Sequence, residues 1–123
     1  MAVEGKDPRP HPLGFDHNYV TQDPDKGLRL IAKVSHPSGR TLMVHTTEPA
    51  VQLYCAKWMP AEGTPGKDGA VYPSHAGFCL ETQAIPDSIG ATEYEHGTCF
   101  ILRPDGPIYE HEVLYQFGSK AFS

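Results

Sequence analysis

Residues 28–47, with the sequence LRLIAKVSHPSGRTLMVHTT, decide the fold class of this chain. Within them, residues 28–35 and 41–47 largely alternate between apolar and polar side chains, which is the pattern of half-buried β-strands. The apolar face predicted for the first run consists of Leu28, Leu30, Ala32 and Val34. Between the runs, residues 37–39 (PSG) supply a fixed φ angle and a permissive glycine, as a turn requires. The stretch therefore predicts a β-hairpin.

The same period-two alternation recurs along the rest of the chain. It predicts a third strand at residues 51–58, a short strand at 77–83, and a final hairpin of residues 98–102 and 108–117 around a turn at 103–106. No segment carries a strong helical pattern. We therefore predict an all-β fold, in the form of an antiparallel β-sandwich.

Proline and glycine set the expected organisation, since each occurs 12 times among 123 residues. Residues 1–12 carry three prolines among charged residues, and we predict a flexible arm there. The remaining residues 13–123 are expected to form one β-domain. Residues 59–74 contain six prolines and glycines, which predicts a long connection and favours a mobile loop beside a site.

Composition excludes several classes of partner. The formal net charge of -5, without any run of Lys or Arg, argues against nucleic acid and anionic lipid. No apolar stretch approaches the ~20 residues that span a bilayer, so no membrane partner is expected. Cys55, Cys79 and Cys99 are an odd, widely spaced set without a Cys-x-x-Cys pair, which favours reduced thiols. A soluble, cytoplasmic protein is the resulting expectation.

The segment with the clearest chemical content is residues 77–83, GFCLETQ. In a strand, Cys79, Glu81 and Gln83 share one face, so a carboxylate and an amide lie together. Apolar neighbours would disfavour the charged form of Glu81 and raise its pKa toward the range of a general base. The alternative from pattern alone is a solvent-facing glutamate on an antiparallel sheet.

Two further places suit a ligand rich in hydroxyl groups. Residues 15–19, FDHNY, are expected in a loop, where Asp16, His17 and Asn18 offer both donors and acceptors. The alternative is turn chemistry, with Asp16 or Asn18 bonded to its own backbone. Gln52 is predicted to share a strand face with Tyr54 and Trp58, or else to be a polar residue on the outer sheet face.

No metal or cofactor is predicted. Adjacent residues on a strand point to opposite faces, and no zinc spacing is present, so solvated charge is the better account of two acidic clusters. These clusters are Glu93, Glu95 and His96, and Glu110, His111 and Glu112. The chain also lacks a Gly-x-Ser-x-Gly elbow and any local thiol-protease signature, so covalent catalysis is unsupported.

Six short segments occur in an order that resembles the C-terminal part of the aldose 1-epimerase (galactose mutarotase) family. The segments are FDHN at 15–18, VSHPSGR at 34–40, TTEP at 46–49, VQLY at 51–54, GFCLETQ at 77–83 and LRP at 102–104. The resemblance covers nearly the whole chain, from residue 12 to residue 117, and the FCLETQ match is highly specific.

The resemblance implies a galactose mutarotase-like supersandwich, of which this chain would form the C-terminal part only. It also implies interconversion of the α and β anomers of aldoses such as galactose and glucose, without a cofactor. By the same resemblance, Glu81 is the catalytic base, Asp16 binds sugar hydroxyls, and Gln52 lies near the substrate.

Two features depart from the family pattern. The general-acid histidine of the family belongs to the upstream two-thirds, and none of the seven histidines here matches its motif. Residues 55–57, CAK, also replace the usual Thr-Gly-Asn. The leading interpretation is therefore a C-terminal fragment of an epimerase. The alternative is a non-catalytic β-domain that binds carbohydrate or a protein, and unpaired sheet edges would favour self-association of either.

Overall fold

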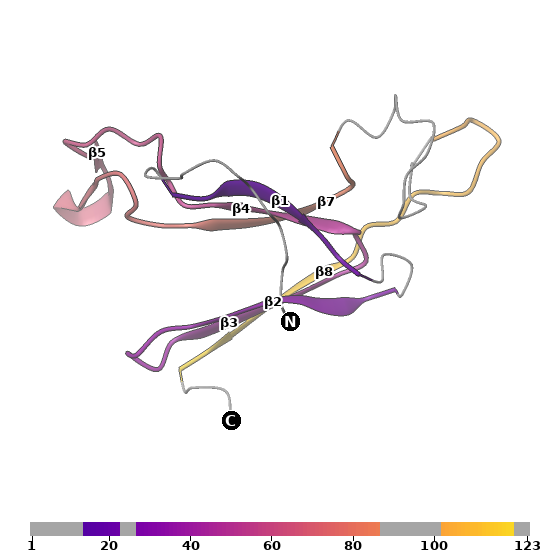
Figure 1. Cartoon of the computed structure of the whole chain (residues 1–123), viewed down its shortest axis with the longest axis horizontal. Helices are drawn as coiled ribbons and strands as arrows, with labels where there is room; N and C mark the ends of the chain where they lie inside the picture. The colour runs from indigo at the N-terminus through magenta and orange to yellow at the C-terminus, as the bar shows by residue number, and fades with distance from the viewer. Residues whose placement is uncertain (1–13, 23–26, 87–101, 120–123) are drawn as a thin grey trace. The chain divides into compact units, whose positions relative to one another are not determined.

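The computed structural model describes residues 14–22, 27–86 and 102–119, in which strands joined by turns and irregular segments make up almost all regular structure. The strands are β1 (Asp16–Val20), β2 (Arg29–Ser35), β3 (Thr41–Thr46), β4 (Ala50–Tyr54), β5 (Thr64–Pro65), β6 (Val71–Tyr72), β7 (Cys79–Gln83) and β8 (Val113–Gly118) (Figure 1). Apart from one 3₁₀ turn, η1 (Lys67–Gly69), the described residues contain no helix. The all-β prediction is confirmed, whereas the predicted arm at residues 1–12 lies outside the described residues.

The strands form three small sheets, in the orders β1-β4-β7, β2-β3-β8 and β5-β6. The pairs β2–β3, β3–β8 and β5–β6 are antiparallel, which agrees with the predicted antiparallel fold class; of these pairs, β2–β3 was predicted. The chain divides into two compact units. The first contains the described residues of Met1–Tyr19 and Gln52–Glu81, and the second those of Val20–Val51 and Thr82–Ser123.

In the second unit, β2 and β3 form the hairpin that the sequence predicts. Ser35 pairs with Thr41 and Val34 with Leu42, next to the turn. The Arg40 carbonyl accepts the N–H of His36 at 3.0 Å, and the His36 carbonyl accepts that of Gly39 at 2.9 Å. Gly39 has a φ angle of 84°, a left-handed conformation that glycine adopts without steric cost. The PSG turn therefore closes the hairpin.

The predicted apolar face of β2 is interrupted by a β-bulge. Leu30 pairs with His45 and Ala32 with Val44, so the register shifts at Ile31. One extra residue in a strand moves the following side chains to the opposite face. As a result Leu30 does not share a face with Ala32 and Val34, and the prediction is wrong for this residue. Leu30 is exposed, while Ile31 is buried.

Strand β8 completes this sheet, with Tyr115 opposite Val44 and Phe117 opposite Leu42. It begins at Val113, five residues later than the sequence indicated. The predicted turn at 103–106 is confirmed by a 3.0 Å bond from the Gly106 N–H to the Arg103 carbonyl. Residues 98–101 of the predicted partner strand lie outside the described residues.

Buried polar groups accompany the small apolar core of the second unit, which consists of Ile31, Val44, Ala50 and Val51. The Arg29 guanidinium donates to the carbonyls of Gly27, Thr46, Thr47 and Glu48 and to the Thr21 hydroxyl, over 2.8 to 3.4 Å. The side chain of Glu48 is almost fully buried, and its Oε1 accepts the Tyr109 hydroxyl. This hydrogen bond, helped by burial and by the negative charge, raises the pKa of Tyr109 to about 12.

Residues 15–19 were expected in a loop, but most of them belong to β1. The Cys55 N–H donates to the Phe15 carbonyl at 3.0 Å, and the Thr21 N–H donates to the Pro49 carbonyl at 2.8 Å. The first bond joins the start of β1 to the end of β4, and the second joins the end of β1 to the start of β4. The two strands are therefore antiparallel. Pairing with β4 satisfies the backbone that turn chemistry would otherwise satisfy. The loop expectation is therefore wrong.

Two other boundaries differ from the prediction. Strand β4 ends at Tyr54 rather than at residue 58, because Ala56 adopts a φ angle of 49° and leaves the extended conformation. The long connection at 59–74 contains the β5–β6 hairpin, in which Thr64 pairs with Tyr72. Gly63 has a φ angle of 92°, and a Cβ there would lie 2.3 Å from Val71, so this hairpin needs a glycine before it.

Candidate functional site

Asp16 and Gln52 both belong to the first unit and lie on the neighbouring strands β1 and β4. Asp16 begins β1 and Gln52 is the third residue of β4. The Gln52 amide Nε2–H donates to Asp16 Oδ1 at 2.8 Å. Two residues that the family resemblance assigned to substrate binding, 36 positions apart, are thus joined directly.

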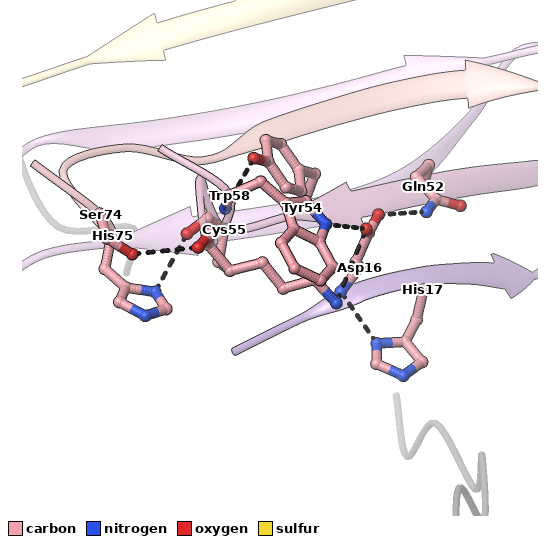
Figure 2. A network of polar contacts seen from close by, with 9 residues as sticks. Asp16, His17, Gln52, Tyr54, Cys55, Trp58, Ser74 and His75 are labelled. Carbon is pink, nitrogen blue, oxygen red and sulfur yellow. Dashed lines mark hydrogen bonds and ion pairs between the residues drawn. The ribbon is translucent and has the colours of Figure 1, made fainter. Parts of the chain in front are cut away.

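The second oxygen of Asp16 is held by two residues that follow β4. The Trp58 indole Nε1–H donates to Asp16 Oδ2 at 3.3 Å, and the Lys57 ammonium lies 3.6 Å from the same oxygen. Figure 2 shows Gln52 and Trp58 approaching the carboxylate from opposite sides. Both oxygens therefore have fixed partners, and the orientation of the carboxylate is set.

These partners lower the pKa of the Asp16 carboxyl below its ordinary value. The hydrogen bond from Gln52 is the largest cause, and partial burial acts against it. The bond from Trp58 and the positive charge of Lys57 lower it further. At neutral pH Asp16 is accordingly a carboxylate, which accepts hydrogen bonds and donates none.

A tight turn presents Lys57 and Trp58 to Asp16. The buried Ala56 carbonyl accepts the N–H of Met59 at 3.3 Å and that of His75 at 3.2 Å. Like Ala56, His75 has a left-handed φ angle, of 64°. The Trp58 N–H donates to the Tyr54 hydroxyl at 3.2 Å, which ties the turn back to β4 (Figure 2). A network of backbone and side-chain bonds thus fixes the turn.

Glu81 lies at the middle of β7, which the sheet order places on the side of β4 opposite β1. Its side chain is exposed, so the burial expected from its apolar neighbours is not found in this chain. Cys79, which shares the strand face of Glu81, is exposed as well, so this part of β7 is open in the described residues. Among the described residues, the bonds to the Asp16 carboxylate come from Gln52, Trp58 and Lys57, not from β7.

Two histidines of the first unit lie near the Asp16 carboxylate and its partners Gln52, Lys57 and Trp58. His17 Nδ1 accepts the Asp16 backbone N–H at 3.0 Å, and its ring meets Phe15 edge-on with centroids 6.1 Å apart. His75 Nδ1 lies 3.2 Å from the Cys55 carbonyl, which can only accept, so this nitrogen carries the proton. Backbone groups thus orient both imidazoles, and Nδ1 is an acceptor in His17 and a donor in His75.

Within residues 14–22, 27–86 and 102–119, no three His, Cys, Asp or Glu side chains come close enough together to hold a metal ion. Glu93, Glu95 and His96 lie outside the described residues, while His111 Nε2 is 3.0 Å from the Thr82 hydroxyl. The described residues also include no helix with the length and apolar character needed to cross a membrane. Cys55 and Cys79 are free thiols.

Sequence reasoning missed Lys57 and the role of Trp58. Trp58 was expected on the strand face of Gln52, but it lies beyond the end of β4 and reaches Asp16 from the turn. The positive φ angle of Ala56 that brings it there is uncommon for a residue with a Cβ. The only signal in the sequence was that residues 55–57 differ from the family pattern, and this difference did not indicate a contact between Trp58 and Asp16.

The chain is similar to known proteins along most of its length. The sequence model of the family described as aldose 1-epimerase matches residues 3–116. The galactose mutarotases of Mus musculus and Homo sapiens are each 43% identical over 109 residues, which is 87% of this chain and 30% of theirs. The aldose 1-epimerase of Escherichia coli (strain K12) is 35% identical over 105 residues, which is 85% of this chain and 29% of that protein. The chain therefore spans less than a third of the length of these relatives.

Proposed function

The chain belongs to the aldose 1-epimerase family, and we propose that it carries the catalytic base and part of the sugar-binding surface of such an enzyme. The reaction is the interconversion of the α and β anomers of an aldose such as galactose or glucose. The observation that carries the proposal is the 2.8 Å bond that joins Asp16 to Gln52. It supports a sugar site because it unites the two residues expected to bind hydroxyl groups.

Asp16 and Gln52 suit sugar hydroxyls by their hydrogen-bonding capacity. The ionised Asp16 carboxylate can accept up to about four hydrogen bonds, so two sugar hydroxyls can donate to it beside Gln52 and Trp58. Gln52 keeps its carbonyl oxygen and a second amide hydrogen for the ligand. A ligand whose hydroxyls both donate and accept is the complement of this pair.

Glu81 is assigned the role of base. Its carboxylate would take the proton of the anomeric hydroxyl while the bond between C1 and the ring oxygen breaks and the ring oxygen gains a proton. The resulting open-chain aldehyde rotates about C1–C2 and closes with the other configuration. The exposure of Glu81 leaves it open to substrate in this chain. The proton for the ring oxygen is assigned to the general acid of the family, which the resemblance places upstream.

The base is tested in a full-length galactose mutarotase whose C-terminal third is replaced by this chain. Glu81→Gln should lower kcat by at least about 100-fold and leave sugar binding unchanged, because the amide cannot accept the anomeric proton. Glu62→Gln, at another exposed glutamate of the same unit, is the matched control and should leave kcat unchanged. Retention of most of the turnover by Glu81→Gln would show that the base is elsewhere.

Asp16→Asn in the same graft should behave differently from Glu81→Gln. It replaces a charged acceptor of sugar hydroxyls, which weakens both ground-state and transition-state contacts, so KM should rise as well. An unchanged KM would contradict the substrate-binding role of Asp16.

The 123-residue chain alone should show little or no mutarotase activity. A missing general acid commonly costs about 10²- to 10⁴-fold in rate. Polarimetry that starts from pure α-galactose measures this directly. Activity near that of an ordinary mutarotase would indicate that a local histidine has replaced the acid, and His17 and His75 would be the first to substitute.

A second candidate function is a sugar-binding domain without turnover. It is favoured by the position of Glu81, which is exposed and outside the network around Asp16. In that case the graft would bind galactose and Glu81→Gln would change nothing. Under either function we place the protein in the cytoplasm, since the free thiols Cys55 and Cys79 suit a reducing compartment. Self-association through sheet edges is proposed for the isolated chain, and sedimentation velocity tests it.

A further inference from the structure

Trp58 is the single tryptophan of the chain, and 69% of it is exposed. Tryptophan is highly buried on average in folded proteins, so an indole this open needs a reason. Its orientation is nevertheless fixed at three points. The backbone N–H bonds to the Tyr54 hydroxyl, the indole N–H to Asp16, and the Lys57 ammonium lies 5.1 Å from the ring centroid.

A held but open aromatic ring beside an ionised carboxylate has a specific chemical complement. A pyranose ring carries C–H groups on its faces and hydroxyl groups around its edge. Its apolar face can lie on an indole while its edge hydroxyls donate to a neighbouring carboxylate. Because Trp58 is already oriented, little side-chain entropy would be lost when the sugar binds.

We propose that Trp58 is a sugar-contact and positioning residue: an aldopyranose stacks on its indole face while the indole N–H holds the Asp16 carboxylate toward the sugar hydroxyls. The inference rests on the proposed function, because it names a contact within the same site. It goes further in giving a role to the turn at residues 56–59, which overlaps the departure from the family pattern at residues 55–57.

Fluorescence provides the first test, since every tryptophan signal of the chain comes from Trp58. Titration of the 123-residue chain with galactose or glucose should give a saturable change in tryptophan emission. Sorbitol at the same concentrations has no pyranose ring and should give none. Binding of each sugar is measured in parallel by saturation-transfer NMR, which does not depend on the tryptophan.

Two substitutions separate stacking from hydrogen bonding. Trp58→Ala removes both the ring and the donor and should raise the Kd for the sugar at least about tenfold. Trp58→Phe keeps an aromatic face and should show a smaller loss, of about two- to fivefold. Tyr72→Ala removes another exposed aromatic side chain of the same unit and should leave the Kd unchanged. Circular dichroism confirms that each variant is folded.

The outcomes distinguish this inference from the proposed function. If the wild-type chain binds the sugar and Trp58→Ala binds it equally well, the stacking role is wrong and the proposed sugar site stands. If neither the wild-type chain nor the full-length graft binds galactose or glucose by NMR, the proposed sugar site is wrong, and the stacking role falls with it. If only the graft binds the sugar, the Kd values of Trp58→Ala and Tyr72→Ala are compared in the graft, with the same expected results. A tenfold loss in Trp58→Ala with an intact Tyr72→Ala supports both.

The positioning role has a readout that needs no sugar. Loss of the indole donor in Trp58→Phe should raise the pKa of Asp16 toward its ordinary value, which the carboxyl carbon resonance reports. In the wild-type chain, the single indole N–H resonance should shift as Asp16 is protonated, and Asp16→Asn should abolish that shift. An unchanged Asp16 pKa in Trp58→Phe would overturn the positioning role.

Discussion

Asp16 in the first unit and Glu48 in the second are both carboxylates fixed by hydrogen bonds, but their surroundings differ. The Asp16 side chain is 31% exposed, whereas Glu48 is only 1% exposed. Both oxygens of Asp16 have partners, while Oε2 of Glu48 has none among the described residues. An open carboxylate with a fixed orientation can receive a ligand. A closed one with an unsatisfied oxygen can only constrain the fold around it.

The effects on pKa follow the same division. The pKa of Asp16 is lowered, because the donors around it favour its charged form. In the other unit the pKa of Tyr109 is raised, because its hydroxyl proton is donated to Glu48. Substitutions around Glu48 should therefore alter stability, and those around Asp16 should alter binding. Four measurements test this division.

The largest effect is expected from Arg29→Met. It removes the donors to four backbone carbonyls and one hydroxyl, some of which belong to buried residues. The free energy of unfolding should fall by at least about 2 kcal/mol, since each buried acceptor left unpaired costs about 1–3 kcal/mol. Urea denaturation measures it. The matched control is Arg40→Met, at an exposed arginine bonded to Ser38, which should stay within about 0.5 kcal/mol of the wild type.

Tyr109→Phe should destabilise the chain by about 1–2 kcal/mol, because it leaves the buried Glu48 carboxylate without its described donor. Thermal unfolding followed by circular dichroism gives the change. Tyr72→Phe is the control, because the Tyr72 hydroxyl has no hydrogen-bond partner among the described residues. It should change stability by less than about 0.5 kcal/mol. Equal effects of the two substitutions would show that the bond between Tyr109 and Glu48 does not stabilise the fold.

The pH dependence of Tyr109 has a defined direction. Its pKa is raised in the folded chain to about 12 from an ordinary value of 10.0. The Glu48–Tyr109 contact therefore stabilises the fold fully below pH 10 and is lost as the pH rises toward 12. Ultraviolet absorbance of tyrosinate should show a late-titrating group in the wild-type chain that is absent in Tyr109→Phe. Ionisation of all tyrosines near pH 10 would contradict this assignment.

The smallest effect on stability is expected at Asp16. Its lowered pKa means that its bonds stabilise the fold above the ordinary value of 3.8 and are lost as the pH falls through the lower folded value. Because the side chain is partly exposed, Asp16→Asn should cost less than about 1 kcal/mol at pH 7. Urea denaturation at pH 7 measures the cost of the substitution, and its repetition at pH 3 measures how much of that cost disappears when the pH is lowered. A loss as large as that of Arg29→Met would make Asp16 a structural residue.

Local sequence patterns predicted the strands of the hairpin, but they predicted neither its β-bulge nor strand β1. The alternation of residues 28–35 and 41–47 identified β2 and β3, because side-chain period follows directly from strand geometry. The bulge at Ile31 was not predicted, although residues 30–32 are a short apolar run that interrupts the alternation, because such a run also fits a regular strand that is covered on both faces. Residues 15–19 read as a loop because Asp and Asn favour turns, yet pairing with β4 outweighs that local preference.

The candidate site was predicted only in part, and mainly by family resemblance. Residue types alone left Asp16, Gln52 and Glu81 with alternatives, since a polar residue on a sheet face has many uses. The bond between Asp16 and Gln52 depends on strand pairing across 36 positions, which no local pattern records. The contact of Trp58 with Asp16 depends on the backbone angle of Ala56, which is set by the tertiary structure.

The turn at Ala56 has a consequence for protein engineering. Ala56 and His75 both adopt left-handed φ angles, and the His75 N–H bonds to the Ala56 carbonyl. Each conformation is uncommon for a residue with a Cβ and persists because neighbouring bonds hold it. Residues 55–58 and 73–76 are therefore expected to keep their conformation in a relative only when both segments are transferred together. A chimaera that exchanges one of these segments with a relative, but not the other, should lose the indole contact with Asp16 while keeping its strands.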